Sequence, residues 1–299
     1  MTRILITGAS GFLGHNLGQV LCRRHEVFAG FCANPPDNGA WTPVQFDVTK
    51  AGDVSAKIEQ ARPDLLIHSA AISQPDECEH RPELARDVIV TGTQNVADGC
   101  RRNSVRLLHI STDLVFDGRR GWYTEEDEVH AISVYSNTKI EAEKVARDAV
   151  PSSTILRVAL LFGIGSSSHQ GSIVSILHSW REGRVLTFYT DQYRTPTYAP
   201  QVAEVVERLL ENPDVRGVFH LGGADRVSRF EFAARLAEKA GIAMQFLRPG
   251  SMFDSQAVAP RGVDCSLVSK KIEEVIGVRP LHCREALDLM EQQGIFQSE

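Results

Sequence analysis

A tyrosine and a lysine with the spacing needed for proton transfer stand near the middle of the chain. Tyr135 and Lys139, in the string YSNTK, lie four residues apart and would share one face of a helix. A free phenol has a pKa near ~10, and a neighbouring ammonium lowers it by favouring the phenolate. We therefore expect Tyr135 to exchange a proton with a carbonyl oxygen, with Lys139 lowering the pKa of the phenol.

Two hydroxyl side chains precede this pair at the end of a buried-type strand. The apolar run Arg106–Ser111 ends in Ser111 and is followed by Thr112. Doubly wound sheets bind their ligands at the carboxyl ends of strands. A hydroxyl there can hydrogen-bond the carbonyl oxygen that Tyr135 protonates. Taken singly, Ser111 fits a helix or turn cap better; taken with the tyrosine and lysine, the order along the chain predicts one catalytic set.

A glycine-rich turn near the N-terminus predicts a phosphate site. Gly8, Gly11 and Gly14 lie between an expected strand, Arg3–Thr7, and an expected helix, Phe12–Arg24. The first glycine permits a tight turn, the second lets the backbone approach a pyrophosphate, and the third allows close packing of helix on strand. The free N–H groups of a helix N-terminus then attract phosphate. This arrangement is typical of dinucleotide binding.

The choice between NADP and NAD depends on the end of the next strand. NAD-selective folds place Asp or Glu about 20 residues past the glycines, on the ribose hydroxyls. Here residues 30–34 read GFCAN, without a carboxylate to repel a 2′-phosphate and without an arginine to hold one. The cofactor is therefore NADP or NAD, and the missing carboxylate favours NADP.

The elements that must position these groups alternate along residues 1–160. Continuous apolar strands separated by helices are typical of a parallel sheet covered on both faces. We predict an α/β fold with a doubly wound, Rossmann-type sheet forming a dinucleotide-binding domain over residues 1–160. The other expected strands are Val27–Phe31, Val44–Phe46, Asp64–Ser69 and Ser153–Val158, and the other helices Ala51–Ala61, Pro82–Arg102 and Tyr135–Val150.

The second half is expected to form a smaller, interleaved α/β domain. Residues 161–299 would bind mainly substrate, while segments near 185–221 return to the first domain. Residues 163–171 read as a flexible loop. The expected helices are Ile173–Arg181, Pro200–Glu211, Arg229–Ala240 and Leu267–Ile276, and the expected strands lie near Val185–Phe188 and Val218–Leu221.

Composition excludes several classes of function. The net charge of −6 supplies no basic field for nucleic acid or anionic lipid. No apolar run approaches the roughly 20 residues of a membrane span, and no signal peptide is recognisable. The six cysteines are scattered, and no cysteine or histidine spacing suggests a metal site. We expect a cytoplasmic protein with reduced thiols and no metal.

Several strings resemble one family. The spacing GASGFLG resembles extended short-chain dehydrogenases/reductases. STDLVFDG followed by YSNTK, then YTDQYRTPT, FEFAARLAEKAG and APRGVDCS, resemble the dTDP-4-dehydrorhamnose reductase family over nearly the whole chain. The resemblance implies hydride transfer from NAD(P)H to C4 of a nucleotide-linked keto sugar, with Thr112, Tyr135 and Lys139 as catalytic residues. It also makes a homodimer plausible.

The resemblance also implies binding residues. Asp47 would touch the adenine, although alone it fits a helix cap equally well. Arg194 and Arg261 would face a pyrophosphate, with surface placement as the alternative, and Asp113 would bind substrate. The cofactor residues are Gly8, Ser10, Gly11, Phe12, Leu13, Gly14, Asp47, Val48, Ser69, Ala70 and Ala71, together with Tyr135 and Lys139.

Three other functions compete with the reductase. Sugar-nucleotide dehydratases carry Asp-Glu after Ser-Thr, whereas Asp113 is followed by Leu114, so dehydration is not expected. Epimerases tend to a serine-rich string there and rank third. The second hypothesis is a non-catalytic NAD(P)-binding subunit resembling the regulatory subunit of methionine adenosyltransferase.

Two positions depart from the family pattern. Leu114 replaces an aromatic side chain, and Ile89 replaces an asparagine that braces the catalytic helix or its lysine. Isoleucine cannot hydrogen-bond, and an unpaired buried group costs ~1–3 kcal/mol. We therefore expect either that water or a shifted helix supplies the missing partner or that Lys139 is held less well, and we expect Ile89→Asn to increase activity. A chain that binds NADPH but reduces no keto sugar would favour the subunit.

Overall fold

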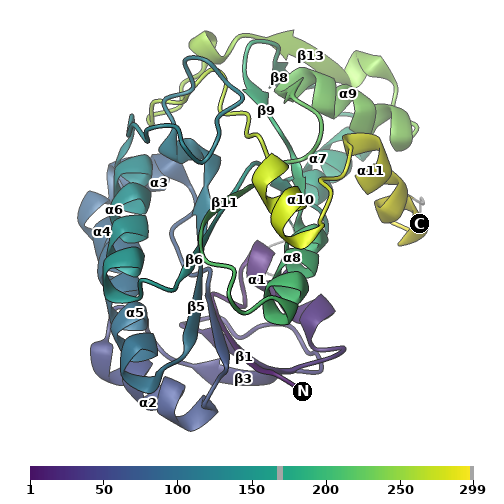
Figure 1. The fold of residues 1–299 in the computed structure, drawn as a ribbon. Helices are drawn as coiled ribbons and strands as arrows, with labels where there is room; N and C mark the ends of the chain where they lie inside the picture. The colour runs from purple at the N-terminus through teal and green to yellow at the C-terminus, as the bar shows by residue number, and fades with distance from the viewer. Residues whose placement is uncertain (167–170, 297–299) are drawn as a thin grey trace.

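The computed structural model describes residues 1–166 and 171–296, which form two lobes of an α/β fold (Figure 1). Residues 167–170, within the expected 163–171 loop, and residues 297–299 lie outside the described residues. In the described chain a parallel sheet of seven strands runs in the order β11-β6-β5-β4-β1-β2-β3. Its strands are β1 (Arg3–Thr7), β2 (Glu26–Phe31), β3 (Thr42–Gln45), β4 (Leu65–His68), β5 (Arg106–Thr112), β6 (Thr154–Val158) and β11 (Gly217–Leu221).

The sheet confirms the predicted doubly wound fold. β2 and β3 follow β1 on one side and β4 lies on the other, so the order of the strands reverses between β1 and β4. The side chains of Ile4, Leu5 and Ile6 are all fully buried because helices cover both faces. A crevice at the carboxyl ends of the strands, where the order reverses, is the usual ligand site of such sheets.

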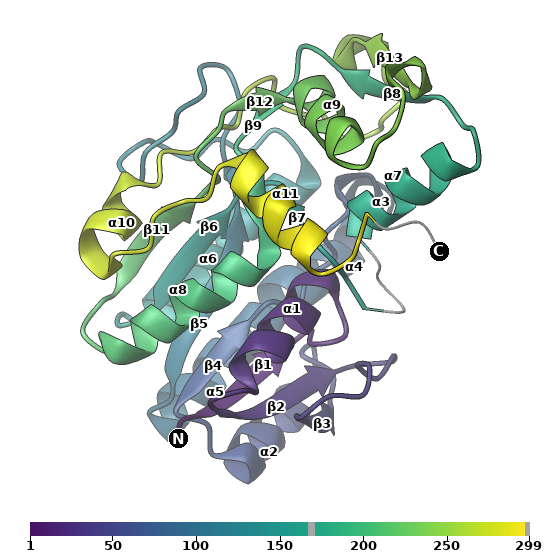
Figure 2. The same ribbon diagram turned by 90° about the vertical axis from the view of Figure 1, so that its right-hand side faces the viewer.

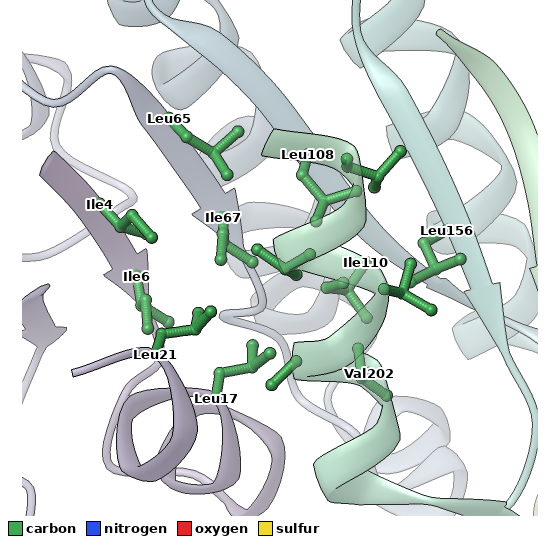
Figure 3. Packing of buried hydrophobic residues seen from close by; sticks show 14 of the residues in the cluster. Ile4, Ile6, Leu17, Leu21, Leu65, Ile67, Leu108, Ile110, Leu156 and Val202 are labelled. Atoms are coloured by element: carbon green, nitrogen blue, oxygen red, sulfur yellow. The ribbon is translucent and has the colours of Figure 1, made fainter. Parts of the chain in front are cut away.

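Two helical layers enclose this sheet. One contains α1 (Phe12–Leu21), α8 (Ala199–Glu211) and α10 (Lys270–Ile276), and the other contains α2 (Ala51–Ala61), α5 (Gly92–Asn103) and α6 (Val134–Ala149). Helices α1 and α8 lie side by side across the sheet (Figure 2). Leu17 of α1 and Val202 of α8 meet Ile6 and Ile110 of the strands in one apolar cluster (Figure 3).

The predicted long helix Pro82–Arg102 is wrong in one respect, because it is interrupted. The structure has α4 (Pro82–Arg86), a π-helical turn at Asp87–Thr91, and then α5. Four consecutive β-branched residues, from Val88 to Thr91, explain the break, since their stiff side chains crowd a regular helix. The other predicted elements of the first half are present, with ends shifted by at most three residues.

The upper lobe forms around a separate apolar cluster. Two helices were not predicted. One, α11 (Cys283–Gln292), lies in this lobe, whereas the other, α3 (Pro75–His80), follows β4 of the central sheet, and Pro75 with two acidic residues after it is a helix start. The predicted helix Leu267–Ile276 begins only at Lys270, because Leu267 bridges to Tyr123. The lobe contains α7 (Gly171–Arg181), α9 (Arg229–Lys239), α11 (Cys283–Gln292) and the short strands β7 (Leu161–Phe162), β8 (Leu186–Tyr189), β9 (Tyr193–Arg194), β10 (Thr197–Tyr198), β12 (Val227–Ser228) and β13 (Leu247–Gly250).

Three features of the described residues bear on the class of protein. Within them, no helix combines the length and apolar character that crossing a membrane requires. The same residues contain no cluster of three His, Cys, Asp or Glu side chains suited to a metal ion. All six cysteines are free thiols.

Candidate active site

The glycine turn forms an open cradle between β1 and α1. Gly8 has a φ of +69°, which favours glycine, and no side chain caps the N-terminus of α1. A Cβ on Gly14 would lie 2.3 Å from the Gly8 carbonyl oxygen, so helix and strand pack too closely there for any side chain. A Cβ on Gly11 would meet only that oxygen, at 3.2 Å. Gly11 therefore presents bare backbone to the adjoining cavity, as a bound pyrophosphate requires.

A cavity of about 950 Å³ extends from this cradle along the carboxyl ends of the strands to the upper lobe. Ligand pockets usually range from ~300 to 1,000 Å³, so this one lies at the upper end of that range. All the site residues predicted from the sequence line it: Gly8, Ser10, Gly11, Phe12, Leu13, Gly14, Asp47, Val48, Ser69, Ala70, Ala71, Ser111, Thr112, Asp113, Tyr135, Lys139, Arg194 and Arg261.

One end of the cavity is bordered by residues 30–34, which comprise the last two residues of β2 and the three that follow. Neither a carboxylate nor a cationic side chain occurs in this segment. Asp47 lies nearby, and its carboxylate accepts hydrogen bonds from the backbone N–H and the hydroxyl of Thr49, at 3.0 and 2.8 Å. Asp47 thus stabilises the turn before α2 and lines the cavity, but it is not the expected helix cap, because the N-cap residue of α2 is Lys50 and no side chain caps this helix.

The hydroxyls of Thr112 and Tyr135 meet beside the cavity. Thr112 ends β5; its hydroxyl donates to the Asp113 carboxylate at 3.1 Å and accepts from the backbone N–H of Leu114. Tyr135 lies in the first turn of α6, which Ser133 caps. Burial raises the pKa of Tyr135, and a hydrogen bond with Thr112 opposes that effect. A phenol in this environment stays protonated and can act as a proton donor.

Lys139 is directed at β5 and does not lower the pKa of Tyr135 as expected. Its ammonium donates to the carbonyl of Ile110 at 2.7 Å and to Nε2 of His109 at 3.4 Å. The side chain is 4% exposed. Burial lowers the pKa of Lys139 to about 8, and the charge of Glu143 acts in the opposite direction. The ammonium is anchored against β5, and for this reason it does not lower the pKa of the Tyr135 phenol.

The Ser111 hydroxyl is hydrogen-bonded to a buried ion pair beneath the site. Its hydroxyl donates to Glu143, whose carboxylate also accepts from Arg157 at 2.7 and 2.9 Å. These three side chains are buried. Although Ser111 borders the cavity, its hydroxyl is used elsewhere, which leaves Thr112 as the hydroxyl beside Tyr135.

The surroundings of Ile89 show that the expectation of a loosely held Lys139 is wrong. Its side chain is 1% exposed and packs in an apolar cluster with Cys78, Ala85, Tyr135 and Ala142. The carbonyl of Ile89 accepts from the hydroxyl of Thr93. Lys139 already has two protein acceptors, so no asparagine is needed at position 89 to hold it.

Both arginines predicted to bind substrate already have protein partners. Arg194 is buried, with Nε 3.4 Å from Oδ2 of Asp113. Burial raises the pKa of Asp113, and the charge of Arg194 opposes this rise. Arg261 pairs with Asp76 and its side chain is 35% exposed, which agrees with the surface alternative.

Two residues that line the cavity were not predicted from the sequence. Gln192 is 4% exposed, and its Nε2 has no hydrogen-bond partner among the described residues. The guanidinium of Arg229 likewise makes no hydrogen bond or ion pair with the described residues. Burial lowers its pKa to about 10, and the charge of Arg194 adds to this. The antiparallel pairing of β12 with β9 brings Arg229 here, and that pairing has no signal in the local sequence.

The fold and site together define a class of protein. A doubly wound sheet, a glycine cradle and adjacent Thr, Tyr and Lys side chains in one cavity characterise an extended short-chain dehydrogenase/reductase, an NAD(P)-dependent oxidoreductase. A family model described as the RmlD substrate binding domain matches residues 1–294. The chain belongs to this family, which confirms the predicted class and its dinucleotide cofactor.

Relatives are similar over most of their length. A dTDP-4-dehydrorhamnose reductase of Aggregatibacter actinomycetemcomitans is 30% identical, covering 96% of this chain and 97% of that protein. The methionine adenosyltransferase 2 subunit beta of Rattus norvegicus is 28% identical, covering 93% and 84%. The structure of dTDP-4-dehydrorhamnose reductase from Bacillus anthracis in complex with NADP superposes with a TM-score of 0.87 at 23% identity, covering 98% and 99%.

Proposed function

We propose that the chain is an NAD(P)H-dependent reductase of a nucleotide-activated 4-keto sugar. The observation that carries the proposal is the meeting of Thr112, Tyr135 and Lys139 at a cavity that begins at the glycine cradle. Full-length similarity to dTDP-4-dehydrorhamnose reductases supports it. The bound cofactor would supply a hydride to the carbonyl carbon.

In this proposal each side chain has a separate task. The Tyr135 phenol, kept protonated by burial, donates its proton to the carbonyl oxygen as the carbon becomes a carbinol. The Thr112 hydroxyl would turn its hydrogen from the Asp113 carboxylate to the same oxygen. Lys139 uses two of its three N–H groups on Ile110 and His109 and offers the third to the cofactor ribose.

The upper end of the cavity would hold the nucleotide sugar. Arg229, a cation without a protein partner in the described chain, suits a pyrophosphate. The unpaired Nε2 of Gln192 suits a hydroxyl of the sugar, and so does Oδ2 of Asp113, which has the Arg194 ion pair but no hydrogen-bond partner among the described residues. The proposal also includes NADP preference, a cytoplasmic location and a homodimer.

The test follows the loss of NADPH absorbance with 4-keto sugars carried on dTDP, UDP and GDP. We expect turnover with one of them, lowered about 10²–10⁴-fold in Tyr135→Phe. Arg229→Gln should raise the KM for the sugar and leave NADPH affinity unchanged. NADPH binding without turnover of any sugar would contradict the proposal.

A non-catalytic regulatory subunit is the second candidate, because similarity to the methionine adenosyltransferase subunit also spans nearly the whole chain. This alternative predicts that the chain forms a stable complex with a methionine adenosyltransferase catalytic subunit. Size-exclusion chromatography of the mixed proteins distinguishes the two candidates.

A further inference from the structure

A histidine lies directly beneath Lys139, between the ammonium and the core. His109 belongs to β5, and its Nε2 accepts from the Lys139 ammonium at 3.4 Å. The imidazole is almost completely buried. Its second nitrogen, Nδ1, has no hydrogen-bond partner among the described residues.

The contact with Lys139 determines the form of this imidazole. An ammonium can only donate, so Nε2 must be the bare nitrogen and Nδ1 must carry the proton. Burial lowers the pKa of His109 well below its usual value, and the charge of Lys139 acts in the same direction. His109 is therefore a neutral, permanent acceptor at any physiological pH.

The neighbouring histidine is occupied by other partners. His68 on β4 lies with its ring 5.4 Å from that of His109. Its Nδ1 contacts the hydroxyl of Thr7 at 2.7 Å, and its Nε2 contacts the hydroxyl of Thr93 at 3.1 Å. Thr93 donates onward to Ile89, so His68 donates through Nε2 and accepts at Nδ1. Both nitrogens are used, and burial lowers the pKa of His68 to about 3.

The remaining charged or titratable neighbours of Lys139 lie on its own helix. Tyr135 precedes it by one turn, and Glu143 follows by one turn. The Glu143 carboxylate is bound by Arg157 and Ser111 and makes no hydrogen bond with the ammonium in the described structure. His109 is thus the side chain that accepts from Lys139 among the residues described, beside the backbone carbonyl of Ile110.

We propose that His109 is a positioning residue that acts through Lys139: it fixes the ammonium against β5 and leaves one N–H directed at the cofactor site. A residue that only filled space would not leave a buried N–H unsatisfied, because an apolar side chain of similar size avoids that cost. The inference rests on the proposed function only in giving Lys139 a contact with the cofactor.

A matched pair of amide variants tests this role. The glutamine amide of His109→Gln reaches the place of Nε2 and keeps an acceptor, whereas the asparagine of His109→Asn reaches only that of Nδ1. NADPH affinity is measured by calorimetry. The Lys139 pKa is measured by NMR on protein with ε-¹³C-labelled lysine, where Lys139→Met assigns the signal among seven lysines.

The asparagine variant should bind NADPH about 10- to 100-fold more weakly, the size expected for a lost hydrogen bond to a charged group. Its Lys139 should titrate below the wild-type value of about 8, because the acceptor favours the ammonium. The glutamine variant should stay close to wild type in both measurements. If the asparagine variant does not fold, His109→Leu, which also lacks the acceptor, replaces it.

Equal NADPH affinities and equal Lys139 titrations in the glutamine variant and the variant without an acceptor would overturn the proposal. Thermal unfolding of each variant separates such a result from general destabilisation. Neither measurement requires turnover, so failure to reduce any keto sugar would refute the proposed function without deciding the role of His109.

Discussion

Arg261 donates to both carboxylate oxygens of Asp76, at 3.2 Å each, and the backbone N–H of Ala259 donates to the same carboxylate at 3.0 Å. Asp76 lies in α3, which follows a strand of the central sheet, whereas Arg261 belongs to the segment after β13. Arg261 also lines the cavity. These contacts therefore fasten the two lobes together at the exposed rim of the candidate site.

Breaking this fastening should weaken substrate binding. Asp76→Ala removes all three hydrogen bonds, so the segment around Ala259 and Arg261 becomes more mobile. We expect a raised KM for the sugar nucleotide, faster proteolysis of that segment and unchanged NADPH affinity. The control is Glu77→Ala, which breaks an exposed pair with Arg81 on the same helix. Identical KM values and cleavage rates in the two variants would contradict this role.

Two substitutions in the glycine turn should have different effects, one on NADPH binding and the other on folding. Gly11→Val places a side chain in the cavity, with the nearest contact of its Cβ at 3.2 Å, so the fold should persist while NADPH binding is lost. Gly14→Val forces a Cβ to 2.3 Å from the Gly8 oxygen and should prevent native folding. Circular dichroism and calorimetry check both. Wild-type affinity in folded Gly11→Val would exclude the cradle as the pyrophosphate site.

Tyr135→Phe should lower turnover by about 10²–10⁴, the usual contribution of a general acid. NADPH affinity should change little, because the ring still packs. Burial raises the pKa of Tyr135, so the phenol is protonated at all pH values below its ordinary range. The rate of reduction should therefore show no loss assignable to this group between pH 6 and 9. An unchanged turnover in the variant would remove Tyr135 from the mechanism.

Ile89→Asn should destabilise the protein without increasing activity. The change places an amide in the apolar cluster around Tyr135, where an unpaired polar group costs about 1–3 kcal/mol. Denaturant unfolding should show this loss, whereas Ile89→Val should lose only about 0.5–1.5 kcal/mol. A variant with both full stability and higher turnover would restore the original expectation of an asparagine brace.

Lys139 should make the stability of the protein depend on pH at alkaline values. Its pKa is about 8 when folded, against ~10.4 in an unfolded chain, so the unfolded state binds more protons between these values. The contribution of Lys139 to the free energy of unfolding should therefore rise by about 3 kcal/mol between pH 8 and pH 10.5. The measurement is the difference in unfolding free energy between wild type and Lys139→Met at each pH. A difference that stays constant over this window would contradict the lowered pKa.

The parts of the fold that rest on local patterns were predictable from sequence. The strand Arg3–Thr7, the glycine turn and the Tyr135 helix depend on apolar runs, glycines and capping residues within a few positions of one another. The π-helical turn was missed because the apolar pattern runs through it, although the run of β-branched residues marks the place. Exact helix ends likewise depend on contacts, as Leu267 shows by its bridge to Tyr123.

The site residues likewise divide into those that local patterns predict and those that depend on contacts between distant segments. Spacing alone indicated Tyr135 and Lys139 because four residues make one helical turn. The acceptor at His109 and the cation at Arg229 depend on pairings between distant segments, which a single sequence does not reveal. The spacing also led to the wrong prediction that Lys139 lowers the pKa of Tyr135. Two residues on one helix face need not interact, and the Lys139 ammonium hydrogen-bonds to β5 instead.

The pairing of β11 with β6 has a consequence for biosynthesis. A ribosome completes β6 well before Gly217–Leu221 emerges, and α8, which covers one face of the sheet, is made in the same interval. Through that time the nascent chain carries an unpaired strand edge beside an uncovered apolar surface, a combination prone to intermolecular pairing. Fragments ending near residue 160 would retain that edge permanently, so we expect them to aggregate when expressed, and the chain to depend on chaperones until its second half has been translated.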